Sequence, residues 1–185
     1  MIAIESFKAF KPRDISAITI LAGLLSLITY LLNQVAFDNA IALLLTLGFF
    51  VTLTTLLIRK AGTAILFFAI VTALTINLAS FGVDGLSKII VMILAGLVFE
   101  LTFLVLKIEI KNIPLDVIIG AALSTASIPL LTGLVASTEI IQSLMINFLN
   151  LIILGFVSGL AGAVLAFLLW WNIRTAKWIM KFEYE

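Results

Sequence analysis

Long apolar runs separated by short polar segments constrain this chain of 185 residues more than any other feature of its sequence. A helix needs about 20 mostly apolar residues to cross the hydrocarbon core of a bilayer. The chain is 63% hydrophobic and 11% charged, whereas a soluble domain is about half apolar and about a quarter charged. A water-soluble fold has no way to cover that much apolar surface. The sequence therefore predicts an all-α, polytopic integral membrane protein.

Breaks in hydropathy and charge place six transmembrane helices along the chain. The expected spans are residues 15–32, 40–58, 62–79, 89–106, 115–135 and 144–171. They take up most of the sequence and leave only short loops, which predicts one membrane domain over residues 1–185. The first span is expected to stay in the protein, because mixed residues precede it and no small-residue cleavage site follows it.

The basic residues fall almost entirely on one side of the membrane if these spans are correct. Six spans place the N-terminal segment, the second and fourth loops and the C-terminal segment together. Ten of the eleven Lys and Arg residues lie there: Lys8, Lys11, Arg13, Arg59, Lys60, Lys107, Lys111, Arg174, Lys177 and Lys181. Only Lys88 is expected on the opposite side. Since positive charges near span ends are retained in the cytoplasm, both termini are predicted to be cytoplasmic.

The last apolar stretch is longer than one crossing requires. As a helix, Ile140 to Trp171 would measure about 48 Å, against a hydrocarbon core of about 30 Å. We therefore expect an outer loop or cap over Thr132 to Ser143, where polar residues and a glycine interrupt the apolar pattern. Beyond the stretch, basic residues on one helix face favour contact with anionic lipid headgroups over a partner protein. They are Arg174, Lys177 and Lys181.

Polar residues inside the spans carry the functional information, because lipid offers them no hydrogen-bond partner. The first span has a stripe of small and polar residues at steps of three and four: Ser16, Thr19, Gly23, Ser26, Tyr30 and Asn33. The small inner half lets another backbone approach closely, either within the protein or from a partner. The larger outer half suits the wall of an outward-facing cavity.

Glu100 is the acidic residue that lies well inside a predicted span. A charge at that depth costs several kcal/mol unless it is paired, hydrated or protonated. The side chain is therefore expected to face the bundle interior or a water-filled cavity. Two interpretations stay open: a structural pair with Arg59 or Lys60, and a role in substrate binding or ion coupling.

Further polar residues gather toward the outer ends of the predicted spans. Together they indicate an outward-opening pocket for a small molecule. The candidate substrate-binding residues are Tyr30, Asn33, Asn77, Asp84, Lys88, Glu100, Glu139, Asn147 and Asn150. Among them, Lys88 is expected at the rim of the pocket, beside Asp84.

The composition argues against several kinds of chemistry. The chain has no Cys and no His, which disfavours disulfides, most transition-metal sites and redox catalysis. It has no phosphate-binding loop of the G-x-x-x-x-G-K-[ST] type and no evident pair of nucleophile and base. We expect no enzyme activity, no cofactor and no metal site. The small net charge gives no reason to expect nucleic acid as a partner.

Two local motifs resemble a known transporter family. The segment Arg59-Lys60-Ala61-Gly62-Thr63-Ala64 resembles the R-K-P-G-x-A signature of the substrate-binding (S) components of energy-coupling factor (ECF) vitamin transporters, specifically the YkoE type. Ala61 stands where that family usually has proline. The segment Gly96 to Phe103 is similar to the family's G-x-x-x-E-[LV]-x-F stretch, with Glu100 at the acidic position.

The resemblance implies a subunit of an ABC-type importer that captures a vitamin or vitamin precursor, of the thiamine or hydroxymethylpyrimidine class, from outside. It also implies a membrane coupling (T) subunit and two ATPase subunits as partners. The candidate docking residues for that partner are Ser16, Thr19, Gly23, Ser26, Arg59 and Lys60. Two alternatives stay open: a membrane scaffold subunit of a larger complex, and a small proton-coupled carrier that uses Glu100.

Overall fold

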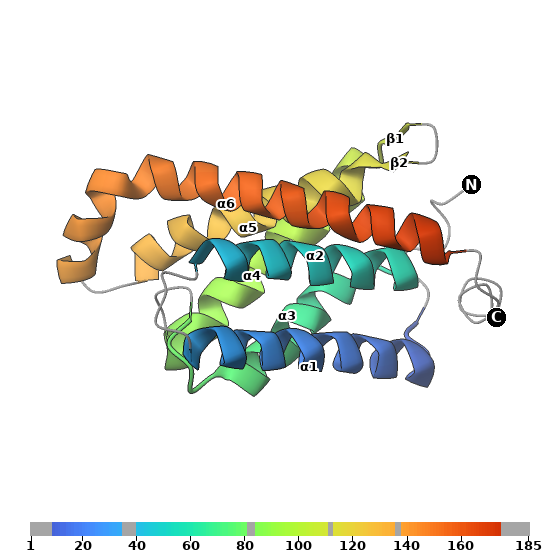
Figure 1. Ribbon diagram of the computed structural model, residues 1–185, viewed down its shortest axis with the longest axis horizontal. Helices are drawn as coiled ribbons and strands as arrows, with labels where there is room; N and C mark the ends of the chain where they lie inside the picture. Colours follow the sequence, from blue (N-terminus) through green and yellow to red (C-terminus); the bar gives the residue numbers. More distant parts are fainter. Residues whose placement is uncertain (1–8, 35–39, 81–83, 111–112, 136–137, 175–185) are drawn as a thin grey trace.

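The chain folds into helices, as the apolar runs predict, with one very short hairpin between them (Figure 1). The computed structural model describes residues 9–34, 40–80, 84–110, 113–135 and 138–174, and the backbone alone for 109–110 and 138–148. The helices are α1 (Pro12–Gln34), α2 (Ala40–Ile58), α3 (Thr63–Thr75), α4 (Gly85–Leu106), α5 (Leu115–Val135) and α6 (Thr138–Ile173). An antiparallel hairpin of β1 (Glu109–Ile110) and β2 (Ile113–Pro114) joins α4 to α5.

The helix lengths identify a multi-pass membrane protein. In the described part of the chain, five helices are long and apolar enough to cross a bilayer: α1, α2, α4, α5 and residues 149–173 of α6. The exception is α3, whose 13 residues give a length of about 20 Å against a core of about 30 Å. The expectation of six full spans is therefore corrected to five long helices and one short one.

The bounds of α2 and α5 match the expected spans, whereas α1, α3, α4 and α6 differ from theirs by one to six residues at one or both ends. The third predicted span reaches residue 79, but α3 ends at Thr75. The expected outer loop over Thr132 to Ser143 is largely helical, because α5 continues to Val135 and α6 begins at Thr138. The excess length of α6 is accommodated by a bend near its beginning, where the helix changes direction (Figure 1).

Glycines bring α2, α5 and α6 into close contact. A Cβ atom built on Gly48 would lie 2.8 Å from the carbonyl oxygen of Gly159, and one on Gly155 would lie 2.9 Å from that of Thr125. A Cβ atom on Gly162 would collide with the carbonyl oxygen of Leu45. Backbones that approach this closely gain van der Waals contact, the main source of helix association in lipid. The small residues of the last span therefore pack inside the protein.

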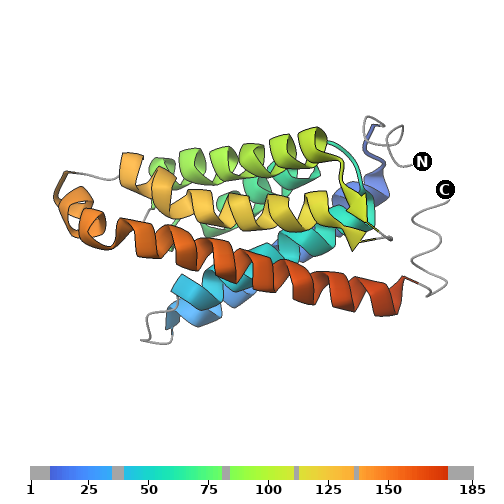
Figure 2. The same cartoon turned by 90° about the horizontal axis from the view of Figure 1, so that it is seen from above.

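The remaining helices extend this group outward. Helix α4 packs on α5, α3 packs on α4, and α1 packs on α3 and α2 (Figure 2). The most apolar 18-residue window of α1 is only 28% buried, against 67% for α2. Helix α1 is thus a peripheral helix with a broad uncovered face.

Basic residues collect at one end of the bundle, which we call the basic end. The start of α1, the end of α2 and the end of α6 meet there (Figure 1). Its described basic residues are Lys11, Arg13, Arg59, Lys60, Lys107 and Arg174. Lys88 lies near the other end, at the start of α4. In the described part of the chain the charges therefore divide as the sequence predicts, and the cytoplasmic location of the basic end stays a prediction.

Candidate functional site around helix α3

Two charged residues of α4 hold the two ends of the short helix α3. Glu100 and Lys88 are twelve positions apart on α4, which is about 18 Å along a helix. That spacing matches the length of α3, so one antiparallel neighbour reaches both of its ends. Both side chains are buried in the protein, with Lys88 fully covered and Glu100 4% exposed.

The N-terminal end of α3 is held by Glu100. Helix α3 begins after Gly62, which has a left-handed backbone (φ 88°) and provides no side-chain cap. The first N–H groups of a helix have no partner within the helix, and the positive end of its dipole lies there. The amide of Ala64 donates to Oε1 of Glu100 at 2.8 Å. A carboxyl group from another helix thus replaces the missing cap.

Gly96 allows α4 to approach α3 closely enough for this contact. It lies one helical turn before Glu100, so both residues face the same side. A Cβ atom built on Gly96 would lie 3.2 Å from the Cα atom of Ile65. The G-x-x-x-E and R-K-A-G-T-A segments, 36 positions apart at their hydrogen bond, therefore meet in space.

The C-terminal end of α3 is held by Lys88. Its ammonium group donates to the carbonyl oxygen of Thr75 at 2.6 Å and to that of Leu78 at 3.0 Å. The same two carbonyl oxygens also accept backbone amides, that of Thr75 from Leu78 and that of Leu78 from Ser80, so Lys88 adds a second, charged donor to each acceptor at the negative end of the helix dipole. Lys88 is therefore an internal cap and not a residue of an exposed pocket rim.

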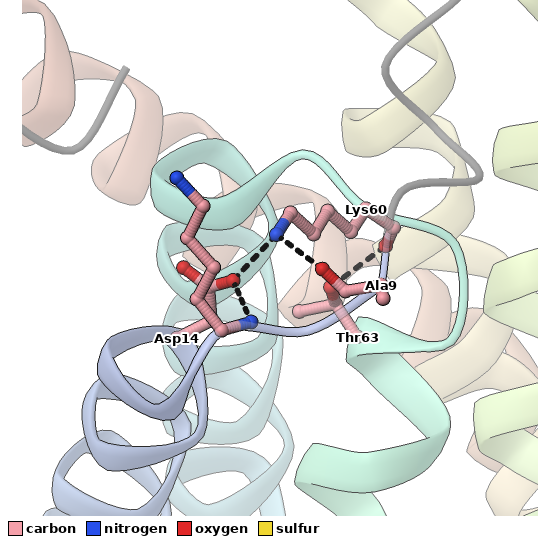
Figure 3. A network of polar contacts seen from close by, with 5 residues as sticks. Ala9, Asp14, Lys60 and Thr63 are labelled. Atoms are coloured by element: carbon pink, nitrogen blue, oxygen red, sulfur yellow. Dashed lines mark hydrogen bonds and ion pairs between the residues drawn. The ribbon is translucent and has the colours of Figure 1, made fainter. Parts of the chain in front are cut away.

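A second polar cluster joins α1 to the turn between α2 and α3 (Figure 3). The ammonium group of Lys60 lies 2.6 Å from Oδ2 of Asp14 and donates to the carbonyl oxygen of Ala9 at 2.8 Å. The amide of Lys11 also donates to Asp14, and the hydroxyl of Thr63 donates to the carbonyl oxygen of Lys60. Lys60 thus pairs with Asp14, and its expected alternative partner Glu100 binds the backbone of α3.

Asp14 was not among the candidates from sequence, although a local signal exists for it. The residue follows Pro12 in the first turn of α1, where acidic side chains are favoured by the helix dipole. Its partner Lys60 is 46 positions away, and no sequence periodicity connects the two. The pair is buried to about nine-tenths, with 12% and 9% of the two side chains exposed.

The other candidate substrate-binding residues lie apart from Glu100. Tyr30, Asn33, Asn77, Asp84 and Asn150 have exposed side chains. Asp84 stands directly before α4, whereas Glu100 lies sixteen positions further along the chain. The side chains of Glu139 and Asn147 lie outside the part of the chain that is described. The structure therefore does not bring Glu100 into one site with the polar residues at the opposite end.

The stripe on α1 divides between two faces. Ser16 and Thr19 are exposed, and their hydroxyl groups donate to backbone carbonyls of α1 itself. A Cβ atom built on Gly23 would have no heavy atom within 4 Å. Ser26 is buried instead and bonds the carbonyl oxygen of Ala22. Tyr30 and Asn33, in the outer half of the stripe, are exposed as well. The uncovered inner half, which we call the α1 face, consists of Ser16, Thr19 and Gly23.

These contacts describe a scaffold of internal caps. Oε2 of Glu100 is buried and has no hydrogen-bond partner among the described residues. No group of three potential metal-ligating side chains occurs among them either. No protein-family model matches the chain, and neither a curated protein nor a solved structure is significantly similar to it.

Proposed function

We propose that this multi-pass membrane protein is the substrate-binding subunit of an ECF-type importer for a vitamin or vitamin precursor of the thiamine or hydroxymethylpyrimidine class. The observation that carries the proposal is the contact between the two motif segments. Glu100 of the G-x-x-x-E segment bonds Ala64 of the R-K-A-G-T-A segment, and Gly96 makes room for Ile65 beside it. The two segments that resemble the family thus act as one structural unit.

The α1 face supports the partner side of this proposal. It is uncovered, its hydroxyl groups are already bonded within the helix, and Gly23 leaves space next to the backbone. A surface of this kind accepts another helix closely without exposing an unpaired polar group. In the proposed function the coupling T subunit packs there, and the two ATPases bind the T subunit on the basic end.

Exposed polar side chains near the end opposite the basic end support the ligand-binding part of the proposal. Tyr30 offers an aromatic face, Asn33 and Asn77 offer amides, and Asp84 offers a carboxylate. A pyrimidine with amino and hydroxymethyl groups needs stacking and paired hydrogen bonds, which these residue types provide. Glu100 is not part of this set, because it serves the backbone of α3.

Ligand binding and partner binding are tested in two separate assays. The purified protein is screened by thermal shift with thiamine, hydroxymethylpyrimidine and other water-soluble vitamins, and stabilisation by one of them is expected. For the partner, the chain is co-expressed with a T subunit and two ATPases and isolated in mild detergent. Gly23→Leu is expected to release the T subunit. Leu24→Phe, which points about 100° around the helix from Gly23, is expected to leave it bound.

The outcomes separate the alternatives. A chain that binds no vitamin but copurifies with a stable partner other than an ATPase module would be a scaffold subunit. A proton-coupled carrier predicts uptake that loses its proton dependence in Glu100→Gln. The bond from Ala64 to Glu100 disfavours the carrier, since the carboxyl group is committed to holding α3.

A further inference from the structure

Two arginines, one directly after α2 and one directly after α6, lie near one tryptophan ring at the basic end. The guanidinium carbon of Arg59, just after α2, lies 5.0 Å from the ring centroid of Trp170 in α6. That of Arg174, just after α6, lies 5.6 Å from the same ring and 3.3 Å from the ring of Trp171. Cations at these distances are attracted to the faces of indole rings. Trp170 is buried and thus provides a fixed platform for both arginines.

The arrangement concentrates positive charge that the described part of the chain does not neutralise. Because both distances end on one ring, the two guanidinium carbons are no more than about 11 Å apart. Asp14, the acidic residue that contacts the turn between α2 and α3, is already paired with Lys60. Among the described residues, neither Arg59 nor Arg174 has a carboxylate partner. Two like charges held this close favour an anion between or beside them.

The backbone conformation of Arg59 also supports a binding role for its side chain. Arg59 has a left-handed conformation (φ 49°) directly after α2, and its amide closes the helix by donating to Thr55 at 2.8 Å. Glycine makes this helix end without the penalty that a side chain incurs. The arginine side chain is therefore not needed for the turn itself. What it supplies is a guanidinium group over Trp170.

We propose that Arg59 and Arg174, held around Trp170, bind the phosphate of an anionic phospholipid headgroup. The guanidinium fork matches phosphate oxygens in a bidentate manner. Tryptophans occupy the headgroup level of membranes, and Trp171 keeps 39% of its surface exposed beside the pair. The basic end is also the end predicted to face the cytoplasm, where anionic lipids attract basic residues. The inference rests on the membrane location of the chain and not on the transport proposal.

Charge-conserving variants separate a built site from general attraction to an anionic surface. The protein is purified in zwitterionic detergent and titrated with phosphatidylglycerol or phosphatidylcholine, and bound lipid is counted by native mass spectrometry. The double variant Arg59→Lys/Arg174→Lys keeps the charge but loses the fork and the stacking. It is expected to weaken retention of phosphatidylglycerol by about tenfold or more. The matched control Lys107→Arg changes a basic residue of the same end away from Trp170 and is expected to bind like the unmodified chain.

Three results would overturn the proposal. If the double variant retains phosphatidylglycerol as well as the unmodified chain does, net charge alone explains the binding. Equal retention of phosphatidylcholine would remove the role of the anionic headgroup. If inorganic phosphate displaces phosphatidylglycerol, the site binds free phosphate and is not specific for a lipid headgroup. Thermal unfolding of each variant in lipid-free detergent checks that the fold is unchanged.

Discussion

At the scale of single residues, the two most deeply buried charges of the described chain have a common explanation. Lys88 and Glu100 are costly in an apolar environment, yet each bonds the backbone at one end of α3. The ammonium group meets the negative end of the helix dipole and the carboxyl group meets the positive end. Each buried group thus complements the dipole at one end of the short helix α3.

Glu100 is expected to act through its acceptor oxygen. Glu100→Ala leaves the buried amide of Ala64 without a partner and is expected to destabilise the protein by about 1 to 3 kcal/mol. Glu100→Gln keeps an acceptor oxygen and is expected to lose less. Reversible unfolding in mixed detergent micelles measures both values. Equal losses for the two variants would show that the acceptor is not what matters.

Substitution of Lys88 is expected to destabilise the protein at least as much as substitution of Glu100. Lys88→Met keeps an unbranched side chain, one heavy atom shorter, but removes three donors, so the carbonyl groups of Thr75 and Leu78 lose a shared partner. A loss of about 1 to 3 kcal/mol is expected, because each acceptor keeps its backbone donor but loses a hydrogen bond to a charged group. Lys107→Met, an exposed lysine at the other end of α4, serves as control and is expected to change stability by under about 0.5 kcal/mol. Similar values for the two lysines would contradict the cap.

At the scale of helices, the sequence predicted the elements whose limits are set locally. The bounds of α2 and α5 agree with expectation because charges and a proline mark them in the chain. Helix α3 was predicted too long, since the apolar residues after Thr75 continue the hydropathy of the helix. The carbonyl groups at its end contact Lys88, which lies ten or more positions further along the chain. Contacts between distant segments, such as Lys60 with Asp14, leave no trace in a periodic pattern.

Alanine substitutions at two glycines of different helices are expected to have different effects on stability. Gly162→Ala forces a Cβ atom against the carbonyl oxygen of Leu45, and a loss of about 1 to 3 kcal/mol is expected from overpacking. Gly23→Ala places the same atom in open space and is expected to be neutral or to stabilise α1 by up to about 1 kcal/mol. Thermal unfolding in detergent compares the two. A tolerated Gly162→Ala would contradict the close packing of α2 on α6.

At the scale of the whole molecule, one end collects the basic residues and the ends of several helices. The sequence predicted this division from span counting alone, and in the described chain it holds even though α3 is short. A helix of 13 residues still reverses the direction of the chain, so successive loops continue to alternate between the two ends of the bundle. What span counting missed is the use of those charges, because Lys60 and Arg59 have partners inside the protein.

The orientation is open to direct measurement because the chain has no cysteine. Single cysteines are introduced at Ile108, near the basic end, and at Asp84, near the other end, since both residues are exposed. With a cytoplasmic basic end, a membrane-impermeant maleimide added to intact cells is expected to label Asp84→Cys and not Ile108→Cys. Inverted vesicles should give the reverse pattern. Labelling of Ile108→Cys in intact cells would place the basic end outside.

Vitamin uptake tests the central claim most directly. Cells that lack their own uptake of thiamine and hydroxymethylpyrimidine are supplied with a T subunit, two ATPases and this chain. We expect uptake of one of these compounds that depends on the chain and on ATP, and that falls with Gly23→Leu but not with Leu24→Phe. No uptake of either compound, although the four proteins assemble in the membrane, would contradict the proposed function.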